Sequence, residues 1–540
     1  MRNHGLGSWM ARRARMTPWR TALTVPRGRM GEATRITYSA LHLRVTRLAN
    51  GLRALGARRG DRIGYLGPNH PAFLETMFAA GTLGAVFVPL HLHFPPADLA
   101  WVLQDTGCGI LVYGAEATPL VEELRPQVPV REYLQVKPPA PGTAPLGRLL
   151  EELLAGQPET PIDEAVELNE PCLISYTSGT TGRPKGVMLS HGNLTWNVFN
   201  FLSTADYLST DVLLQVAPLY RLGGLGVVAL PGLFKGAELV VTPTVDPDEL
   251  LSVIERHRVT VLFGSPGLFR ALLESPRAAH AELSTLRFCI CGGDSVPEAL
   301  IRAWLQRGVR FQQGYGLTEA APMALLLDAE EMMAKVGAAV RPPFFTDVRV
   351  VHPDMADAAP GESGEIVIHG PNVMLGYWGQ PEATDAAITH GGWLHSGDAA
   401  RVEADGHIYV LGRTADAIEL AGAIVYPEEI EGELDRHPAV AECAVAGFSE
   451  GDDIAVAAFV VCRTGWACEA RELLSFLAAR LPSERVPRRI EFVEALPKNA
   501  NGKLIRRRLR ERLEREYPRA PTESRPQSSC RSWQLESLTP

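Results

Sequence analysis

Short apolar runs alternate with segments of helical period from about residue 35 to residue 400. Parallel strands need a long crossover between them, which a helix usually supplies, so this alternation predicts α/β layers with largely parallel sheets. The strand-like runs include Asp61–Leu66, Gly84–Pro89, Gly109–Tyr113, Ala237–Val241 and Thr260–Phe263, and the helical segments include Tyr38–Leu55 and Asp248–His257.

A chain of 540 residues is too long for one hydrophobic core, so more than one domain is expected. Val348–His352 and Glu365–His369 predict a small β-region that ends a large domain over residues 1–411. After Gly412 the pattern changes to that of a small mobile α+β domain over residues 412–517. Its expected elements are helix 427–436, strands 442–446 and 455–462, helix 470–481, strand 489–493 and a last helix.

The basic run Lys503–Arg519 carries Glu and Leu at helical spacing and is interpreted as a solvated helix face. Residues 518–540 are rich in Pro, Ser and Arg and are predicted to be disordered.

The composition argues against several classes of protein. A formal net charge of −9 gives no electrostatic reason to expect nucleic acid as a partner. Residues 1–15 lack the apolar segment of a secretory signal, and Phe73–Leu90 reads as a buried helix plus strand instead of a membrane span. The eight cysteines are scattered without disulfide or zinc spacing, so a cytoplasmic location is expected.

Ser175–Asn193 holds a loop rich in hydroxyls and glycines, with one lysine, between two apolar runs. Glycines let backbone N–H groups approach an anion, hydroxyls donate to phosphate oxygens, and the lysine supplies positive charge. The loop therefore predicts a polyphosphate site, with ATP as the expected guest. Its residues are Thr177, Ser178, Gly179, Thr180, Thr181, Gly182 and Lys185.

This loop is not a Walker A motif. That motif needs Gly-Lys-Ser/Thr in direct succession, followed by a helix. Here Arg183 and Pro184 separate Gly182 from Lys185, and Val187–Leu189 reads as a strand.

Four later motifs carry further candidate chemistry. Phe311–Glu319 combines an aromatic, a hydroxyl and a carboxylate around a glycine turn, which suits base stacking, phosphate binding and Mg²⁺ ligation. Gly392–Asp398 ends in a carboxylate suited to ribose hydroxyls, and Gly412-Arg413 stands at the expected domain junction. Pro497–Lys503 presents a lysine after a flexible turn.

Together, in this order, the motifs resemble those of the adenylate-forming enzymes, typified by acyl-CoA synthetases, firefly luciferase and nonribosomal-peptide adenylation domains. The resemblance covers about residues 5–515. The opening Gly5–Pro18 and the run Gly84–Leu90 are most similar to the fatty-acid-type CoA ligases.

The resemblance implies a role for each matching residue. Lys503 would be the catalytic lysine, Lys185 would assist at the phosphates, Thr318 would contact the α-phosphate, and Glu319 with Thr177 would hold Mg²⁺. Tyr315 would stack on adenine, while Asp398 and Arg413 would bind ribose. The remaining nucleotide-site positions are Gly292, Gly293, Asp294, Gln313, Gly314 and Gly316, and the acyl tunnel would include Tyr220, Arg221, Gly223, Gly224 and Leu225.

The chemistry explains why such residues are needed. A carboxylate that attacks the α-phosphate brings two anions together, so a lysine and Mg²⁺ must neutralise the growing charge. The resemblance implies that the small domain then rotates, so that a CoA thiol attacks the acyl-adenylate.

Three positions depart from the family pattern. Arg221 stands where histidine is usual. Its guanidinium could pair with a carboxylate at the far end of the acid or with phosphate, or it could point to solvent. We favour the solvent-directed position. Ala415 replaces a common Asp or Lys at the hinge. Ala421–Ile424 replaces polar residues in the loop that faces the pantetheine tunnel, which leaves transfer to CoA less certain than adenylation.

The sequence therefore predicts an ATP- and Mg²⁺-dependent acid:CoA ligase for a medium- or long-chain aliphatic acid, because Gly223, Gly224, Leu225 and Val227 leave room for a chain. One alternative passes the acyl group to a carrier-protein thiol or an amine. A non-catalytic nucleotide or acyl sensor is disfavoured because the charged site residues are all present. The oligomeric state and the identity of the acid stay open.

Overall fold

The computed structural model describes residues 3–28, 31–137, 145–177, 183–327, 331, 335, 341–420, 423–450, 453–466, 468–498 and 504–517. The chain divides into two compact units. The first contains residues 1–296, 300–348 and 368–394, and the second contains residues 297–299, 349–367 and 395–540.

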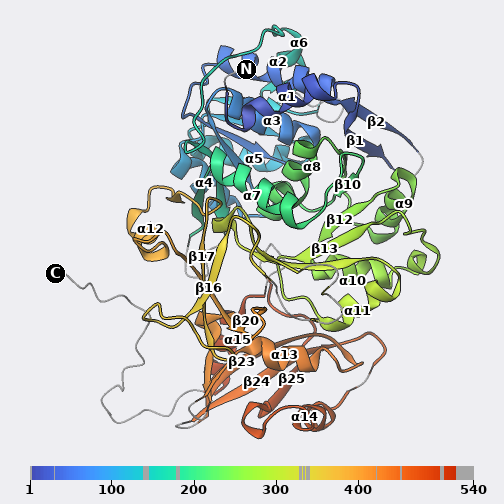
Figure 1. The fold of residues 1–540 in the computed structure, drawn as a ribbon, viewed down its shortest axis with the longest axis vertical. Coiled ribbons are helices and arrows are strands. Elements are labelled where there is room, and N and C mark those ends of the chain that lie inside the picture. Colours follow the sequence, from blue (N-terminus) through green and yellow to red (C-terminus); the bar gives the residue numbers. More distant parts are fainter. Residues whose placement is uncertain are drawn as a thin grey trace, which may run out of the picture. The chain divides into compact units, whose positions relative to one another are not determined.

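The first unit contains two large sheets (Figure 1), each with eight strands in the part of the chain that the structure describes. In the first sheet β1, β11, β10, β12, β13 and β14 pair in parallel, while β2 and β15 pair antiparallel at its two edges. In spatial order its strands are β15 (Met323–Leu326), β14 (Phe311–Gly316), β13 (Phe288–Gly292), β12 (Val261–Gly264), β10 (Val212–Gln215), β11 (Glu238–Val241), β1 (Thr21–Arg27) and β2 (Gly31–Thr37).

The second sheet of this unit has a parallel centre and one antiparallel edge. The β8–β9 hairpin and β18 form that edge. In spatial order the strands are β18 (Gly376–Tyr377), β9 (Lys185–Ser190), β8 (Pro171–Thr177), β4 (Val86–Leu90), β3 (Arg62–Leu66), β5 (Ile110–Tyr113), β6 (Glu132–Gln135) and β7 (Arg148–Leu149). The predicted α/β architecture with largely parallel sheets is confirmed.

Helices of the first unit pack on both sheets. Helix α7 (His191–Thr204) contacts β8 and β9 of one sheet and β15 of the other. It begins with a capping box, in which Ser190 and Asn193 satisfy each other's backbone N–H groups. The other elements are η1 (Leu6–Ser8), α1 (Trp9–Met16), α2 (Tyr38–Ala54), α3 (Pro71–Thr82), α4 (Pro96–Thr106), η2 (Ala115–Ala117), α5 (Thr118–Leu124), η3 (Arg125–Gln127), α6 (Leu150–Ala155), the π-helix η4 (Gly223–Ala229), α8 (Leu230–Lys235), α9 (Pro247–His257), α10 (Pro266–Glu274), η5 (Pro276–His280), α11 (Glu298–Gln306), η6 (Thr318–Ala320) and α12 (Pro381–Ala387).

The second unit holds most of a four-stranded sheet and a smaller α+β body, counted over the described residues. The four strands are β16 (Asp347–Val351), β17 (Ser363–His369), β19 (Leu394–Val402) and β20 (Ile408–Arg413). The α+β body comprises η7 (Thr414–Asp416), β21 (Ile418–Leu420), β22 (Ala423–Val425), α13 (Pro427–Leu434), β23 (Val440–Glu450), β24 (Asp453–Cys462), α14 (Ala470–Ala478), η8 (Ser483–Arg485), β25 (Arg489–Phe492) and α15 (Arg506–Glu516).

These elements match the predicted helices and strands of residues 412–517 within a few residues. The domain boundary between residues 411 and 412 stays a prediction. Residues 518–540 lie outside the described part of the chain.

The last helix differs from the prediction of a solvated face. Leu509 and Leu513 are buried, and the Arg506 side chain is only 10% exposed. Arg506 contacts the carboxylates of Asp416, Glu428 and Glu431. The periodicity placed the leucines correctly on one face, but it gave no sign that an arginine would be buried among three acids.

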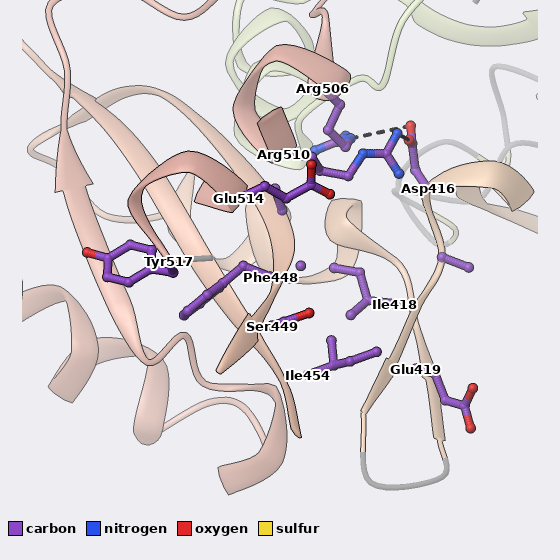
Figure 2. A pocket seen from close by; sticks show the side chains of 13 residues that line it. Asp416, Ile418, Glu419, Phe448, Ser449, Ile454, Arg506, Arg510, Glu514 and Tyr517 are labelled. Atoms are coloured by element: carbon purple, nitrogen blue, oxygen red, sulfur yellow. Dashed lines mark hydrogen bonds and ion pairs between the residues drawn. The ribbon is translucent and has the colours of Figure 1, made fainter. Parts of the chain in front are cut away.

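A cavity of about 530 Å³ adjoins this ion cluster within the second unit. Figure 2 shows Arg506 and Arg510 directed toward Asp416, with Ile418 and Ile454 on the apolar side of the cavity. Arg510 Nη2 lies 2.9 Å from Asp416 Oδ1. The last helix therefore holds the segment that follows Arg413.

Glu428 lies in the crowded part of this cluster. Its Oε1 accepts from Arg506 at 2.9 Å, whereas its Oε2 is buried without a hydrogen-bond partner. A Cβ at Gly412, where φ is +136°, would stand 2.1 Å from that Oε2, so only glycine fits. Burial raises the pKa of Glu428 to about 7, because the loss of hydration and the nearby carboxylates of Glu431 and Asp416 outweigh the attraction of Arg506.

We predict that Glu428→Gln raises the melting temperature at pH 8, by roughly a few degrees. The pKa of this carboxyl is higher in the folded chain than in the unfolded chain. Its contribution to the free energy of unfolding is therefore complete below about pH 4.5 and is lost as the pH rises through about 7. The gain should therefore disappear toward pH 5. Glu433→Gln, on the same helix in a more exposed ion pair with Arg436, is the control, and equal gains at both pH values would contradict the assignment.

Candidate active site

The predicted phosphate loop connects the two strands of the β8–β9 hairpin. Thr177 and Lys185 are direct cross-strand partners at its base. This pairing places a hydroxyl and an ammonium group on either side of the loop. Ser178, Gly179, Thr180, Thr181 and Gly182 lie outside the described residues.

Lys185 is linked to Glu319 through a residue that sequence reasoning missed. The Lys185 ammonium lies 5.1 Å from the ring centroid of Tyr377, a cation–π contact. The Tyr377 hydroxyl donates to Glu319 Oε1 at 3.0 Å. Tyr377 is positioned because β18 pairs with β9, with Tyr377 opposite Val187. The structure thus brings a predicted phosphate ligand and a predicted metal ligand to one tyrosine.

The predicted adenine positions lie at the carboxyl ends of β13 and β14, which pair in parallel with Gly292 opposite Gly314. Tyr315 is half-buried on β14, and Thr318 begins the short helix η6 after it. Gly293 has φ of +86°, and Asp294, beside it, is exposed.

Two glycines here are required by backbone packing. A Cβ at Gly316 would lie 1.8 Å from the Pro322 carbonyl oxygen, and one at Gly292 would lie 2.7 Å from the Gly314 carbonyl oxygen. The side chain of Gln313 carries a buried Oε1 without a hydrogen-bond partner. An orphaned buried acceptor is costly unless a ligand satisfies it, so this edge fits a ligand with an N–H donor, such as adenine.

The predicted ribose residues Asp398 and Arg413 form an ion pair in the second unit. Arg413 Nε lies 3.1 Å from Asp398 Oδ1, and the Asp398 side chain is 12% exposed. The two residues are opposite each other on β19 and β20. Their antiparallel pairing explains why two motifs fifteen positions apart converge.

A second ion pair shapes the turn before Asp398. Glu365 Oε2 lies 2.9 Å from His395 Nδ1, while its Oε1 accepts the Gly397 N–H at 2.9 Å. Gly397 has φ of +70°, a conformation that favours glycine. The hydrogen bond to Glu365 raises the pKa of His395. Sequence reasoning missed Glu365 and His395, although both stand in strand motifs.

Lys503 lies outside the described residues, as do Ala421 and Gly422 of the predicted pantetheine-tunnel loop. In the described part of that loop, Ala423 and Ile424 are exposed on β22. Ala415 lies in η7, where its carbonyl accepts from Arg510 at 3.3 Å.

The preference for a solvent-directed Arg221 is wrong. Burial lowers the pKa of this guanidinium, its Nε is buried without a partner, and its Nη2 lies 3.5 Å from His91 Nε2. His91 stacks on Phe94 at 4.6 Å and lies 4.5 Å from the Tyr220 ring. The arginine is therefore partly buried beside the His91 ring instead of directed into water.

Gly223 and Gly224 were expected to leave room for an acyl chain, but in the structure neighbouring residues occupy the space that their side chains would need. A Cβ at Gly224 would lie 2.3 Å from the Pro218 carbonyl oxygen, and one at Gly223 would press on the Phe263 ring at 3.1 Å. Gly224 thus permits a tight backbone approach, and Leu225 is fully buried. Both glycines and Leu225 belong to the π-helix η4 (Gly223–Ala229), an element that is rare and often found at functional sites.

Comparison with known protein families identifies the family to which this chain belongs. The sequence pattern described as AMP-binding enzyme matches residues 10–378, and that described as AMP-binding enzyme C-terminal domain matches residues 429–503. The chain belongs to the AMP-binding enzyme family. The resemblance to adenylate-forming enzymes is confirmed, and the protein is an AMP-forming acid–thiol ligase that uses a small-molecule acid, ATP and CoA.

Relatives within the AMP-binding enzyme family match over nearly the whole chain. A feruloyl-CoA synthase from Amycolatopsis sp is 46% identical over 518 residues, which covers 95% of this chain and 100% of the relative. An indoleacetate–CoA ligase from Aromatoleum aromaticum is 34% identical, with 92% and 96% of the two chains covered.

Solved structures agree with this membership. An anthranilate CoA ligase in complex with anthranoyl-AMP has a TM-score of 0.89 at 26% identity and covers 96% of this chain and 98% of its own. An o-succinylbenzoate CoA synthetase from Bacillus subtilis, in complex with ATP and a magnesium ion, has a TM-score of 0.81 at 28% identity, with coverages of 93% and 99%. Across the described residues of this family member, no helix is long and apolar enough to cross a membrane.

We predict that Tyr377→Phe raises the KM of this AMP-binding enzyme for ATP by about 2- to 10-fold, the equivalent of one typical hydrogen bond. The change keeps the ring beneath Lys185 and removes only the donor to Glu319. Steady-state kinetics at limiting ATP would measure it. Tyr409→Phe, whose ring also lies beneath a cation, Arg401, is the control, and equal effects of the two changes would contradict the role.

We predict that His395→Gln destabilises the enzyme more at pH 6 than at pH 9. A histidine whose pKa is raised by its partner contributes stability that is complete below its usual pKa and is lost as pH rises through the raised one. Since His395 is half-exposed, the effect should stay below about 1 kcal/mol. Thermal unfolding at both pH values, with the exposed His390→Gln as control, measures it, and a difference that grows with pH would refute the pairing.

Proposed function

We propose that this enzyme converts an aromatic carboxylic acid of the hydroxycinnamate type to its CoA thioester, through an acyl-adenylate and release of pyrophosphate. One observation carries the choice of acid: the 46% identity to a feruloyl-CoA synthase along the full length of that relative. The sequence-based expectation of a medium- or long-chain aliphatic acid has no support from the two relatives described above, whose names specify aromatic acids.

The surroundings of Arg221 support an aromatic guest. The His91 ring lies beside this guanidinium, the Phe94 and Tyr220 rings pack on His91, and Phe263 lies next to Gly223. Aromatic side chains favour planar ligands through offset or edge-to-face contacts, and an arginine stacks on such a ring or donates to its oxygen substituents. Arg221 therefore acts as a specificity residue in this proposal.

The proposed chemistry distributes the charge of adenylation over several residues. Thr177 and Lys185, with the loop between them, bind the β- and γ-phosphates, while Thr318 contacts the α-phosphate. Glu319 and Thr177 are the proposed Mg²⁺ ligands; carboxylate and hydroxyl oxygens suit this ion, and a relative holds ATP with magnesium. The ion would offset negative charge on the phosphates.

Lys503 is the proposed bridge between the attacking carboxylate and the α-phosphate. The carboxylate oxygen forms a bond to the α-phosphorus while the bond to pyrophosphate breaks. Asp398 and Arg413 hold the ribose, and Gln313 and Tyr315 hold adenine. The thiolate of CoA then attacks the acyl carbon, and AMP leaves with the bonding electrons. A rotation of the small domain at the hinge near Ala415 is the proposed change between these two steps.

The test is an acid-dependent pyrophosphate-release screen with matched acids, run with and without CoA. Ferulic, 4-coumaric, indoleacetic, octanoic, palmitic and succinic acids separate aromatic, aliphatic and dicarboxylic classes. We expect kcat/KM for ferulic acid to exceed that for octanoic acid at least tenfold, with one CoA consumed per AMP formed.

The Lys503→Ala variant serves as the control for adenylation, and its rate should fall to background while ATP binding persists. A preference for palmitic acid would overturn the aromatic assignment. Pyrophosphate release without CoA consumption would instead favour a carrier-protein thiol or an amine as acceptor, and activity confined to succinic acid would make Arg221 a carboxylate ligand.

A further inference from the structure

Trp101 on helix α4 contacts Arg183, which lies in the segment between the predicted phosphate loop and Lys185. The guanidinium of Arg183 lies 4.6 Å from the ring centroid of Trp101. Arg183 is exposed, and only Pro184 separates it from Lys185, where strand β9 begins. Two neighbouring cations of this segment therefore make cation–π contacts, Arg183 with Trp101 and Lys185 with Tyr377.

Helix α4 is held firmly on the same sheet edge. The Tyr176 hydroxyl, on β8 directly before Thr177, donates to the Asp105 carboxylate in the last turn of α4. The indole N–H of Trp378, which follows β18, donates to the Asp105 backbone carbonyl at 3.1 Å. The backbone N–H of Trp378 donates to the Gly186 carbonyl oxygen at 2.7 Å. Both strands that flank the loop are thus fastened to the helix that presents Trp101.

Stability alone does not explain a tryptophan at this position. The indole N–H of Trp101 is buried without a hydrogen-bond partner, and an unsatisfied buried donor is a cost that phenylalanine or leucine would avoid. Tryptophan offers the best ring face for a cation among the aromatic side chains. The contact with Arg183 offsets part of that cost.

We propose that Trp101 is a positioning residue for ATP binding, which acts by holding Arg183 so that Lys185 faces the phosphates. The inference rests on the proposed function of Lys185. Trp101 touches neither ATP nor the acid in this account. It acts through Arg183 and the rigid Pro184, whose ring restricts the backbone between the two cations.

A double-mutant cycle tests the inference. Trp101→Leu and Arg183→Met each remove one partner, and we expect each to raise the KM for ATP about 2- to 5-fold, with the double variant no worse than the stronger single one. The KM values for acid and CoA should stay unchanged. Trp101→Phe, which keeps an aromatic face, should recover most of the ATP affinity.

A matched control comes from another cation–π pair in the same unit. Arg125 lies 5.4 Å from the Tyr133 ring, and Arg125→Met should leave the KM for ATP unchanged. Effects of Trp101→Leu and Arg183→Met that simply add would overturn the inference. So would a parallel rise in all three KM values, because that pattern indicates general destabilisation.

Equilibrium dialysis of ATP without acid separates this inference from the proposed function. If the wild-type chain binds ATP and Trp101→Leu weakens binding while Arg125→Met does not, the positioning role holds even when no acid in the screen is activated. If the wild type activates ferulic acid and Trp101→Leu binds ATP normally, the positioning role fails and the proposed function stands.

Discussion

The antiparallel pairing of β8 with β9 is the constraint on which the candidate site of the first unit depends. It sets Thr177 opposite Lys185, at the two ends of the predicted phosphate loop. The pairing of β18 on β9 then brings Tyr377 beneath Lys185 and against Glu319. Because regular backbone hydrogen bonds hold these strands, the cation and the carboxylate are placed before any ligand binds, which reduces the cost of binding polyphosphate.

The second unit contains a buried cluster of opposite charges around Arg506. Arg506 is buried among three carboxylates, and removal of this arginine would leave uncompensated buried negative charge. The cluster fastens α15 to Asp416 and places Glu428 against Gly412. The segment that follows Arg413 is therefore held in place by α15. A segment held in this way suits a proposed hinge, because the small domain that carries Lys503 would have to rotate as one body between the two reactions.

Much of the fold followed from local patterns, because period and turn chemistry act over short distances. The strands near Gly84 and Thr260 and the helix near Tyr38 were predicted within a few residues. The contacts of Tyr377, Glu365 and Trp101 were not, since each depends on which strands or helices become neighbours. Arg221 was misjudged for the same reason: its burial is set by His91, 130 positions away. The motifs indicated the chemistry, whereas the choice of acid depended on similarity to known relatives.

The central claim is that the carboxylate oxygen of an aromatic acid attacks the α-phosphorus of ATP. An oxygen-isotope experiment tests it directly: ferulic acid labelled with ¹⁸O in both carboxylate oxygens is incubated with the enzyme, ATP and CoA, and the released AMP is analysed by mass spectrometry. The account predicts one ¹⁸O atom in each AMP formed and none in pyrophosphate. Unlabelled AMP, or label in inorganic phosphate with ADP as the product, would contradict it.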